Sequence, residues 1–345
     1  MSVVLSSAPC LMAPGESLAF AVAVAAEAAL PLIPLEERRF EGGELKLRPL
    51  ESVRGRAVFV LESLAGTGET PVCDRLVRLL FLLQGLRDGG AHATVAVLPY
   101  LAFARKDRRT QLRDPVTSRY VAELLEATGV AQVVCLDVHN PAAFDNAFRV
   151  PTIHLTALPM MVEHFAHQVP AAGFAVVSPD VGGIKRAQIF RELLAARTAS
   201  EVELAFVEKR RAKGVVATGL LAGDIAGRAA IVLDDLCATG GTLIRAAEAC
   251  HRAGARHVQA AVTHTPLAAG LEALLAADAV SAIVVTDSVG IDFSATRSRA
   301  PSDRLVILPV ARLIAQAVGR MIAGRPVAEL LERWPPRTAP AGPTR

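Results

Sequence analysis

Two adjacent carboxylates followed by a small-residue turn form the strongest chemical motif of the sequence. The apolar run 229–233 leads into Asp234 and Asp235, and residues 238–242 read Ala-Thr-Gly-Gly-Thr before a helical pattern begins. Such a turn aims several backbone N–H groups at one point, where the dipole of the following helix also favours an anion. The motif predicts a site for a phosphate monoester, with the two acids beside ribose hydroxyls or a metal ion. The alternative, that the acids only cap the next helix, accounts for less of the pattern.

Two clusters of cations each follow a predicted strand. Residues 105–109 read Arg-Lys-Asp-Arg-Arg, and Lys209, Arg210 and Arg211 follow the apolar run 204–207. Taken alone, either cluster could be a solvated surface. Their positions after strands, together with the phosphate turn, favour a triphosphate site. Cations suit such chemistry because phosphoryl transfer depends mainly on positioning and charge stabilisation.

His139 and Asp180 end two further apolar runs. Taken alone, His139 would be a strand-end histidine that its neighbours satisfy. Open parallel sheets, however, gather their ligands at the carboxyl ends of the strands, where both residues are expected. Magnesium prefers oxygen ligands and retains several waters. The pair therefore predicts a metal or nucleotide site, in which, if the metal is magnesium, His139 acts through water or contacts a phosphate.

The elements that must position these residues alternate along the chain. The predicted strands are 3–6, 57–61, 94–98, 133–137, 175–178, 229–234, 258–262, 282–286 and 306–309. The predicted helices are 17–29, 71–88, 115–129, 183–196, 241–254 and 310–323. Several strands are apolar without alternation, as expected of strands that helices cover on both faces. The order predicts an α/β protein with mostly parallel sheets.

The composition excludes several classes of protein. The 345 residues are 52% hydrophobic with a net charge of +3, which argues against disorder and against a broad nucleic-acid surface. Aromatic residues make up 4%, too few for base-stacking platforms. The 5 cysteines are scattered, which favours a reducing cytoplasm. No membrane span is predicted, because Glu27, Pro31 and Pro34 interrupt the apolar stretch 18–35.

In their order along the chain, these motifs resemble the ribose-phosphate pyrophosphokinase family. The segment 229–242 is similar to a ribose-phosphate signature that phosphoribosyltransferases share. The segments that distinguish the pyrophosphokinases are 39–44, 99–109, 136–139, 177–183 and 208–211. The resemblance extends from about residue 3 to residue 334.

The resemblance implies two phosphoribosyltransferase-like domains, each a mostly parallel sheet flanked by helices. The first, 1–156, would carry the ATP-binding segments, and the second, 157–309, the loop for ribose 5-phosphate. Residues 310–334 would form a helix that packs on the first domain. The proline-rich tail 335–345 is expected to be disordered.

The activity implied is transfer of the β,γ-diphosphoryl group of ATP to the C1 hydroxyl of ribose 5-phosphate, giving phosphoribosyl pyrophosphate and AMP for nucleotide biosynthesis. By resemblance, Lys209 and Arg211 are catalytic, and His139 and Asp180 serve the magnesium ion. The ATP-binding residues are Phe40, Gly42, Glu44, Arg105 and Lys106. The residues for ribose 5-phosphate are Asp234, Asp235, Ala238, Thr239, Gly240, Gly241 and Thr242. The stretch 212–219 would form a loop that closes over ATP.

The family's adenine loop commonly reaches a neighbouring subunit, which implies a homo-oligomer built from dimers, up to a hexamer. Three positions depart from the family pattern. Ala238 stands in place of a third aspartate, Gly42 in place of a loop aspartate, and Val181 in place of a histidine. Two alternatives stay open: a regulatory paralogue that binds ligands without turnover, and a phosphoribosyltransferase.

Overall fold

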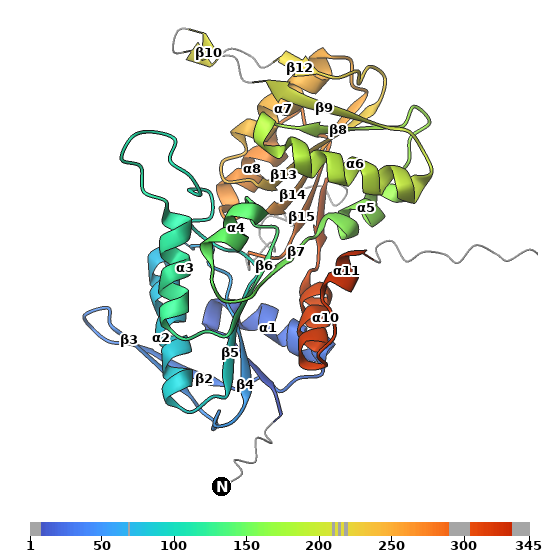
Figure 1. The fold of residues 1–345 in the computed structure, drawn as a ribbon. Helices are drawn as coiled ribbons and strands as arrows, with labels where there is room; N and C mark the ends of the chain where they lie inside the picture. Colours follow the sequence, from blue (N-terminus) through green and yellow to red (C-terminus); the bar gives the residue numbers. More distant parts are fainter. Residues whose placement is uncertain are drawn as a thin grey trace, which may run out of the picture.

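Two sheets, each covered by helices, make up the computed structural model (Figure 1). The structure describes residues 8–67, 70–208, 211–212, 215–216, 220–289 and 304–332. The strand expected at 3–6 and the tail 335–345 lie outside these residues. The predicted α/β class with mostly parallel sheets is confirmed.

The first sheet has five parallel strands in the order β1-β4-β5-β6-β7. They are β1 (Cys10–Met12), β4 (Ala57–Leu61), β5 (Ala93–Leu98), β6 (Gln132–Leu136) and β7 (Thr152–Leu155). The helices of this half are α1 (Gly15–Ala28), α2 (Val72–Asp88), α3 (Thr117–Ala127) and α4 (Pro141–Ala147). The interior residues of β4, β5 and β6 are buried, as the unbroken apolar runs predicted.

The second sheet has seven strands in the order β12-β9-β8-β13-β14-β15-β16, and only the β12–β9 pair is antiparallel. They are β8 (Phe174–Ser178), β9 (Val202–Glu208), β12 (Leu220–Ala222), β13 (Ala229–Leu236), β14 (His257–His264), β15 (Ala282–Thr286) and β16 (Leu305–Leu308). The helical elements are α5 (Leu158–Ala166), the 3-10 turn η1 (Val181–Gly183), α6 (Ile184–Thr198), α7 (Gly241–Arg252) and α8 (Ala268–Ala276).

Two short ladders lie outside the sheets. The hairpin of β2 (Leu35–Arg39) and β3 (Leu45–Pro49) was not predicted, because its strands are rich in charge and lack a continuous apolar run. The ladder of β10 (Arg211–Ala212) and β11 (Val215–Val216) includes the described part of the predicted loop 212–219. The rest of that stretch lies outside the described residues.

The last long helix described lies against the first half of the chain. Helix α10 (Ala311–Ile322) packs on α1, and the short α11 (Ala328–Glu332) follows it (Figure 1). Val24 of α1 and Ile314 of α10 belong to one buried cluster that also contains Phe174 of β8 and Ile231 of β13. Because this apolar core continues from one sheet to the other, its burial stabilises both halves together.

The chain passes from the first sheet to the second between β7 and α5, which packs against α6. The proposed domain boundary between residues 156 and 157 falls in this connection. Among the described residues, no helix is both long and apolar enough to cross a membrane.

Candidate active site

The carboxyl ends of the two sheets meet at one junction (Figure 1). His264, the last residue of β14, makes a hydrogen bond of 3.0 Å from its Nε2 to the Leu136 carbonyl oxygen at the end of β6. Its Nδ1 lies 2.8 Å from the Ser288 hydroxyl, and the Tyr100 ring packs edge-on against its imidazole. Both sheets therefore present their ligand-binding edges to the same space.

Asp137 fixes this junction from the first sheet. Its φ of 39° is left-handed, which is uncommon for a residue other than glycine. One carboxylate oxygen accepts a hydrogen bond of 2.6 Å from the Thr156 hydroxyl. The other accepts bonds from the Ala157 N–H, at 3.0 Å, and from the Thr263 hydroxyl, at 2.7 Å. These bonds hold the strained turn that leads to His139.

A small cavity of about 10 Å³ lies at the junction. Its lining comes from both halves of the molecule and includes Tyr100, Arg105, His139, Asp235 and His264. His139 Nδ1 lies 2.9 Å from Asp235 Oδ2, so the structure brings together two predicted site residues that are far apart in the sequence.

Arg186, from the first turn of α6, completes this contact. Its Nη1 lies 2.6 Å from Asp235 Oδ1 and 3.7 Å from Asp234 Oδ1, and its Nη2 donates a 3.3 Å hydrogen bond to the His139 carbonyl oxygen. Arg186 is not among the predicted site residues, although a cation in the first turn after the 177–183 segment was a usable signal.

The pKa values of the two adjacent aspartates are shifted in opposite directions. Burial raises the pKa of Asp234, and the neighbouring Asp235 carboxylate raises it further. Burial also acts to raise the pKa of Asp235, but the hydrogen bond from His139 and the charge of Arg186 outweigh it and hold the pKa below its usual range. The hydrogen bond to Asp235 in turn raises the pKa of His139. Asp235 is thus the stronger acid of the pair.

The small-residue turn joins β13 to the N-terminus of α7. Gly240 has a φ of 77°, a conformation that favours glycine, and α7 begins at the next residue. Helix α8 crosses this turn closely, since a Cβ on Gly270 would lie 2.5 Å from the Ala238 carbonyl oxygen. Thr239 is exposed at the turn. The predicted order of buried strand, acid pair, turn and helix is present in the structure.

Asp180 caps the 3-10 turn that precedes α6. Its Oδ1 accepts hydrogen bonds from the Gly182 N–H at 3.0 Å and the Gly183 N–H at 3.3 Å. The structure thus places Asp180 at the end of β8 and His139 against Asp235. Among the described residues, no group of three or more His, Cys, Asp or Glu side chains could hold a metal ion.

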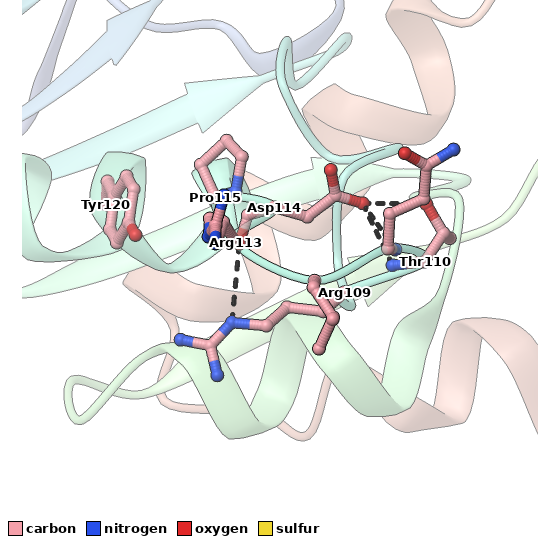
Figure 2. Close-up of a pocket in the computed structure, with 8 residues that line it drawn as sticks. Arg109, Thr110, Arg113, Asp114, Pro115 and Tyr120 are labelled. Atoms are coloured by element: carbon pink, nitrogen blue, oxygen red, sulfur yellow. Dashed lines mark hydrogen bonds between the residues drawn. The ribbon is translucent and has the colours of Figure 1, made fainter.

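The predicted phosphate-binding cations lie on the loop after β5. Arg105 lines the cavity, whereas the Lys106 ammonium forms an ion pair with Asp114. Figure 2 shows that Asp114 also accepts hydrogen bonds from Thr110, whose N–H lies 3.0 Å from Asp114 Oδ2. Lys106 thus has an anionic partner from its own loop.

The predicted ATP-binding residues of the β2–β3 hairpin do not line the cavity of their own chain. Phe40, Gly42 and Glu44 lie at the end of the β2–β3 hairpin, which projects beside α2 and away from the loop after β5 (Figure 1). Arg211 lies in β10, where the structure places its backbone. Lys209 lies outside the described residues.

Comparisons with known proteins cover both halves. Residues 10–129 match the N-terminal domain of ribose phosphate pyrophosphokinase, and residues 178–332 match the phosphoribosyl synthetase-associated domain. The ribose-phosphate pyrophosphokinase of Fusobacterium nucleatum subsp. nucleatum is 35% identical over 320 residues, 91% of this chain and 95% of that protein. Its counterpart in Bradyrhizobium diazoefficiens is 36% identical over 323 residues, 93% of this chain and 97% of that protein.

A comparison with solved structures also finds a match over most of the chain. The crystal structure of phosphoribosylpyrophosphate synthetase from Mycobacterium smegmatis matches with a TM-score of 0.80 at 28% identity. The match covers 92% of this chain and 100% of that one. The similarity therefore includes the order and arrangement of both sheets.

Proposed function

Because this chain belongs to the ribose-phosphate pyrophosphokinase family, we propose that it transfers the β,γ-diphosphoryl group of ATP to the C1 hydroxyl of ribose 5-phosphate. The products are phosphoribosyl pyrophosphate and AMP. The observation that carries this proposal is the 2.9 Å contact between His139 of the first half and Asp235 of the second. It puts a predicted ATP-side residue and a predicted sugar-side residue beside one cavity.

Ribose 5-phosphate binds at the turn after β13 in this proposal. The backbone N–H groups of Thr239, Gly240 and Gly241 and the hydroxyl of Thr242 receive the phosphate at the N-terminus of α7. Asp234 and Asp235 lie next to the sugar hydroxyls. The side chain of Ala238 supplies no polar group, so the backbone N–H groups of the turn make most of the phosphate contact.

ATP binds from the side of the first sheet, with Arg105 and Lys106 at its phosphates. A magnesium ion fits this donor set, because magnesium is commonly held by one or two carboxylates together with substrate phosphates and waters. Asp180, at the end of β8, and His139, directly or through water, would hold it. There the ion would neutralise charge on the phosphate oxygens.

In the transfer step the C1 oxygen forms a bond to the β-phosphorus, and the bond from that phosphorus to the bridging α,β oxygen breaks. AMP leaves with the bridging oxygen, and the hydroxyl proton passes to water. Lys209 and Arg211 stabilise the charge on the transferred group in this proposal, since such cations act mainly on the transition state.

We also propose a homo-oligomer built from dimers, in which the β2–β3 hairpin completes the ATP site of a neighbouring subunit. The position of Phe40, Gly42 and Glu44 away from their own cavity supports this arrangement (Figure 1). As part of the same proposal, the enzyme works in the cytoplasm, where its free cysteines stay reduced.

The test is to supply the purified protein with ATP, Mg²⁺ and ribose 5-phosphate and to quantify AMP and phosphoribosyl pyrophosphate. Wild type is expected to form both in equal amounts, and Lys209→Ala to lose most turnover while folding normally. Arg119→Ala is the control, because it removes an exposed cation of α3, paired only with Glu123 among its described contacts. A folded wild type that binds substrate without product would instead be a regulatory paralogue. Consumption of phosphoribosyl pyrophosphate with a nucleobase would indicate a phosphoribosyltransferase.

A further inference from the structure

The side chain of Arg186 contacts both halves of the molecule. It arises from the first turn of α6, in the second half, and its guanidinium reaches the carbonyl oxygen of His139 in the first. Its side chain is 15% exposed, and its hydrogen bond to the His139 carbonyl oxygen lies at an exposed position. A long side chain held in this way loses conformational freedom, which the contacts must offset.

Asp235, His139 and Arg186 form a closed ring of contacts. Asp235 Oδ2 contacts His139 Nδ1 at 2.9 Å, and Asp235 Oδ1 contacts Arg186 Nη1 at 2.6 Å. Arg186 Nη2 donates to the His139 carbonyl oxygen at 3.3 Å, which closes the ring. The planar guanidinium, with its donors in a rigid fork, fixes the carboxylate and the histidine backbone at once.

The buried Asp235 carboxylate requires a cationic partner such as Arg186. The Asp235 side chain is 5% exposed, and a buried carboxylate is stable only when it is paired and hydrogen-bonded. Asp234 is adjacent and places a second carboxyl group 3.7 Å from the same guanidinium. Arg186 therefore supplies the cation that the buried Asp235 carboxylate needs and lies close to the second acid of the pair.

We propose that Arg186 is a positioning residue for diphosphoryl transfer. It holds Asp235 and His139 together, so that ATP bound to the first half and the sugar phosphate bound to the second meet in line. This inference rests on the proposed function. Its physical basis is that small errors in the alignment of reacting groups reduce rates strongly.

The kinetic test compares Arg186→Gln and Arg186→Lys with wild type. Arg186→Gln is expected to lower kcat about 10-fold to 100-fold, as for other outer partners of site ligands, with little change in KM for either substrate. Arg186→Lys is expected to recover part of kcat, because it keeps the charge but not the fork. Arg191→Gln, farther along the same helix and paired with Glu192, is the control and should keep wild-type kinetics.

A double-mutant cycle with Asp235→Asn separates positioning from a general loss of packing. If the two residues act as a unit, the double variant should be little slower than the slower single variant. Additive losses would overturn the proposal. A raised KM with unchanged kcat would also overturn it, since Arg186 would then bind substrate directly. A lower melting temperature with unchanged kcat would make Arg186 a structural residue only.

A measurement without turnover keeps the inference distinct from the proposed function. In protein labelled with ¹⁵N-histidine, with the His139 signals assigned by a His139→Gln variant, Arg186→Gln should shift the ring resonances of His139 and Arg191→Gln should not. Unchanged His139 resonances would overturn the positioning role. An inactive wild type in which Arg186→Gln still shifts them would reject the proposed function and keep the positioning role.

Discussion

The Thr263 hydroxyl donates a 2.7 Å hydrogen bond to the Asp137 carboxylate and so joins the end of β14 to the end of β6. Thr263 is 1% exposed and Asp137 is 4% exposed. Because Asp137 also holds the turn before His139, this bond connects the packing of the two sheets with the position of a proposed site residue.

Thr263→Val should therefore reduce both stability and turnover. The substitution removes a buried donor at nearly constant volume, and the expected loss in free energy of unfolding is about 1 to 2 kcal/mol. Chemical denaturation and kcat are the measurements. Thr286→Val is the control, since the Thr286 hydroxyl donates within the second sheet to the Thr263 carbonyl oxygen. If both variants keep full kcat, the cross-sheet bond does not serve the site.

Gly270→Ala, a substitution in α8, should displace the phosphate-binding turn that α8 contacts. A Cβ at Gly270 would lie 2.5 Å from the Ala238 carbonyl oxygen, so either the turn or α8 must move. We expect KM for ribose 5-phosphate to rise more than KM for ATP, measured by steady-state kinetics with each substrate varied. Gly85→Ala is the matched control, because nothing lies within 4 Å of its Cβ and α2 should gain about 0.5 to 1 kcal/mol. Equal effects at the two glycines would contradict this account.

Asp114→Asn should strengthen ATP binding at low salt. The Asp114 carboxylate pairs with Lys106, which we assign to the ATP phosphates, so the acid competes with the nucleotide. Asparagine keeps an oxygen that can accept the Thr110 and Gln111 N–H groups but removes the charge. We expect KM for ATP to fall by roughly 2-fold to 5-fold and the difference to shrink as salt is added. A higher KM would show that Asp114 orders the loop for binding instead.

Glu16→Gln should destabilise the protein in a pH-dependent way. Burial acts to raise the pKa of Glu16, but hydrogen bonds from Arg78 and Thr70 outweigh it and lower the pKa from 4.5 to about 2. The unfolded chain thus binds this proton more readily, so the stabilisation is complete above pH 4.5 and is lost as the pH falls through about 2.

The expected cost of Glu16→Gln at pH 7 is at most about 3 kcal/mol, from urea unfolding. The gap between variant and wild type should narrow at pH 4 and again at pH 3. Glu27→Gln, an exposed position of the same helix, should leave stability unchanged throughout. A gap that is constant with pH would assign the effect to packing rather than to the charge of Glu16.

The sequence predicts the buried strands and the long helices well, because burial on both faces leaves unbroken apolar runs. β4 and β15 have the predicted bounds, and β13 extends the predicted strand to include both acids. The hairpin β2–β3 could not be recognised in this way. Its strands, Leu-Glu-Glu-Arg-Arg and Leu-Lys-Leu-Arg-Pro, are held by cross-strand charge pairs such as Glu36 with Arg48.

The site is predictable where its residues lie at or just after the end of a buried strand, as Asp235 and His139 do. Contacts between the two halves cannot be predicted in this way, since the sequence does not show which strand ends face each other. The contacts of Arg186 and Asp137 were therefore not predicted, although Asp137 lies inside the segment 136–139 and Arg186 lies three residues after the segment 177–183. The roles of Lys209 and Arg211 stay predictions.

The packing of α10 on α1 has a consequence for synthesis on the ribosome. Helix α1 is translated well before residues 311–322, which pack on it. Apolar side chains of α1 such as Val24 are therefore synthesised before helix α10, on which α1 packs. During that interval the nascent first half exposes apolar surface, and a chaperone that binds such surface would protect it from aggregation.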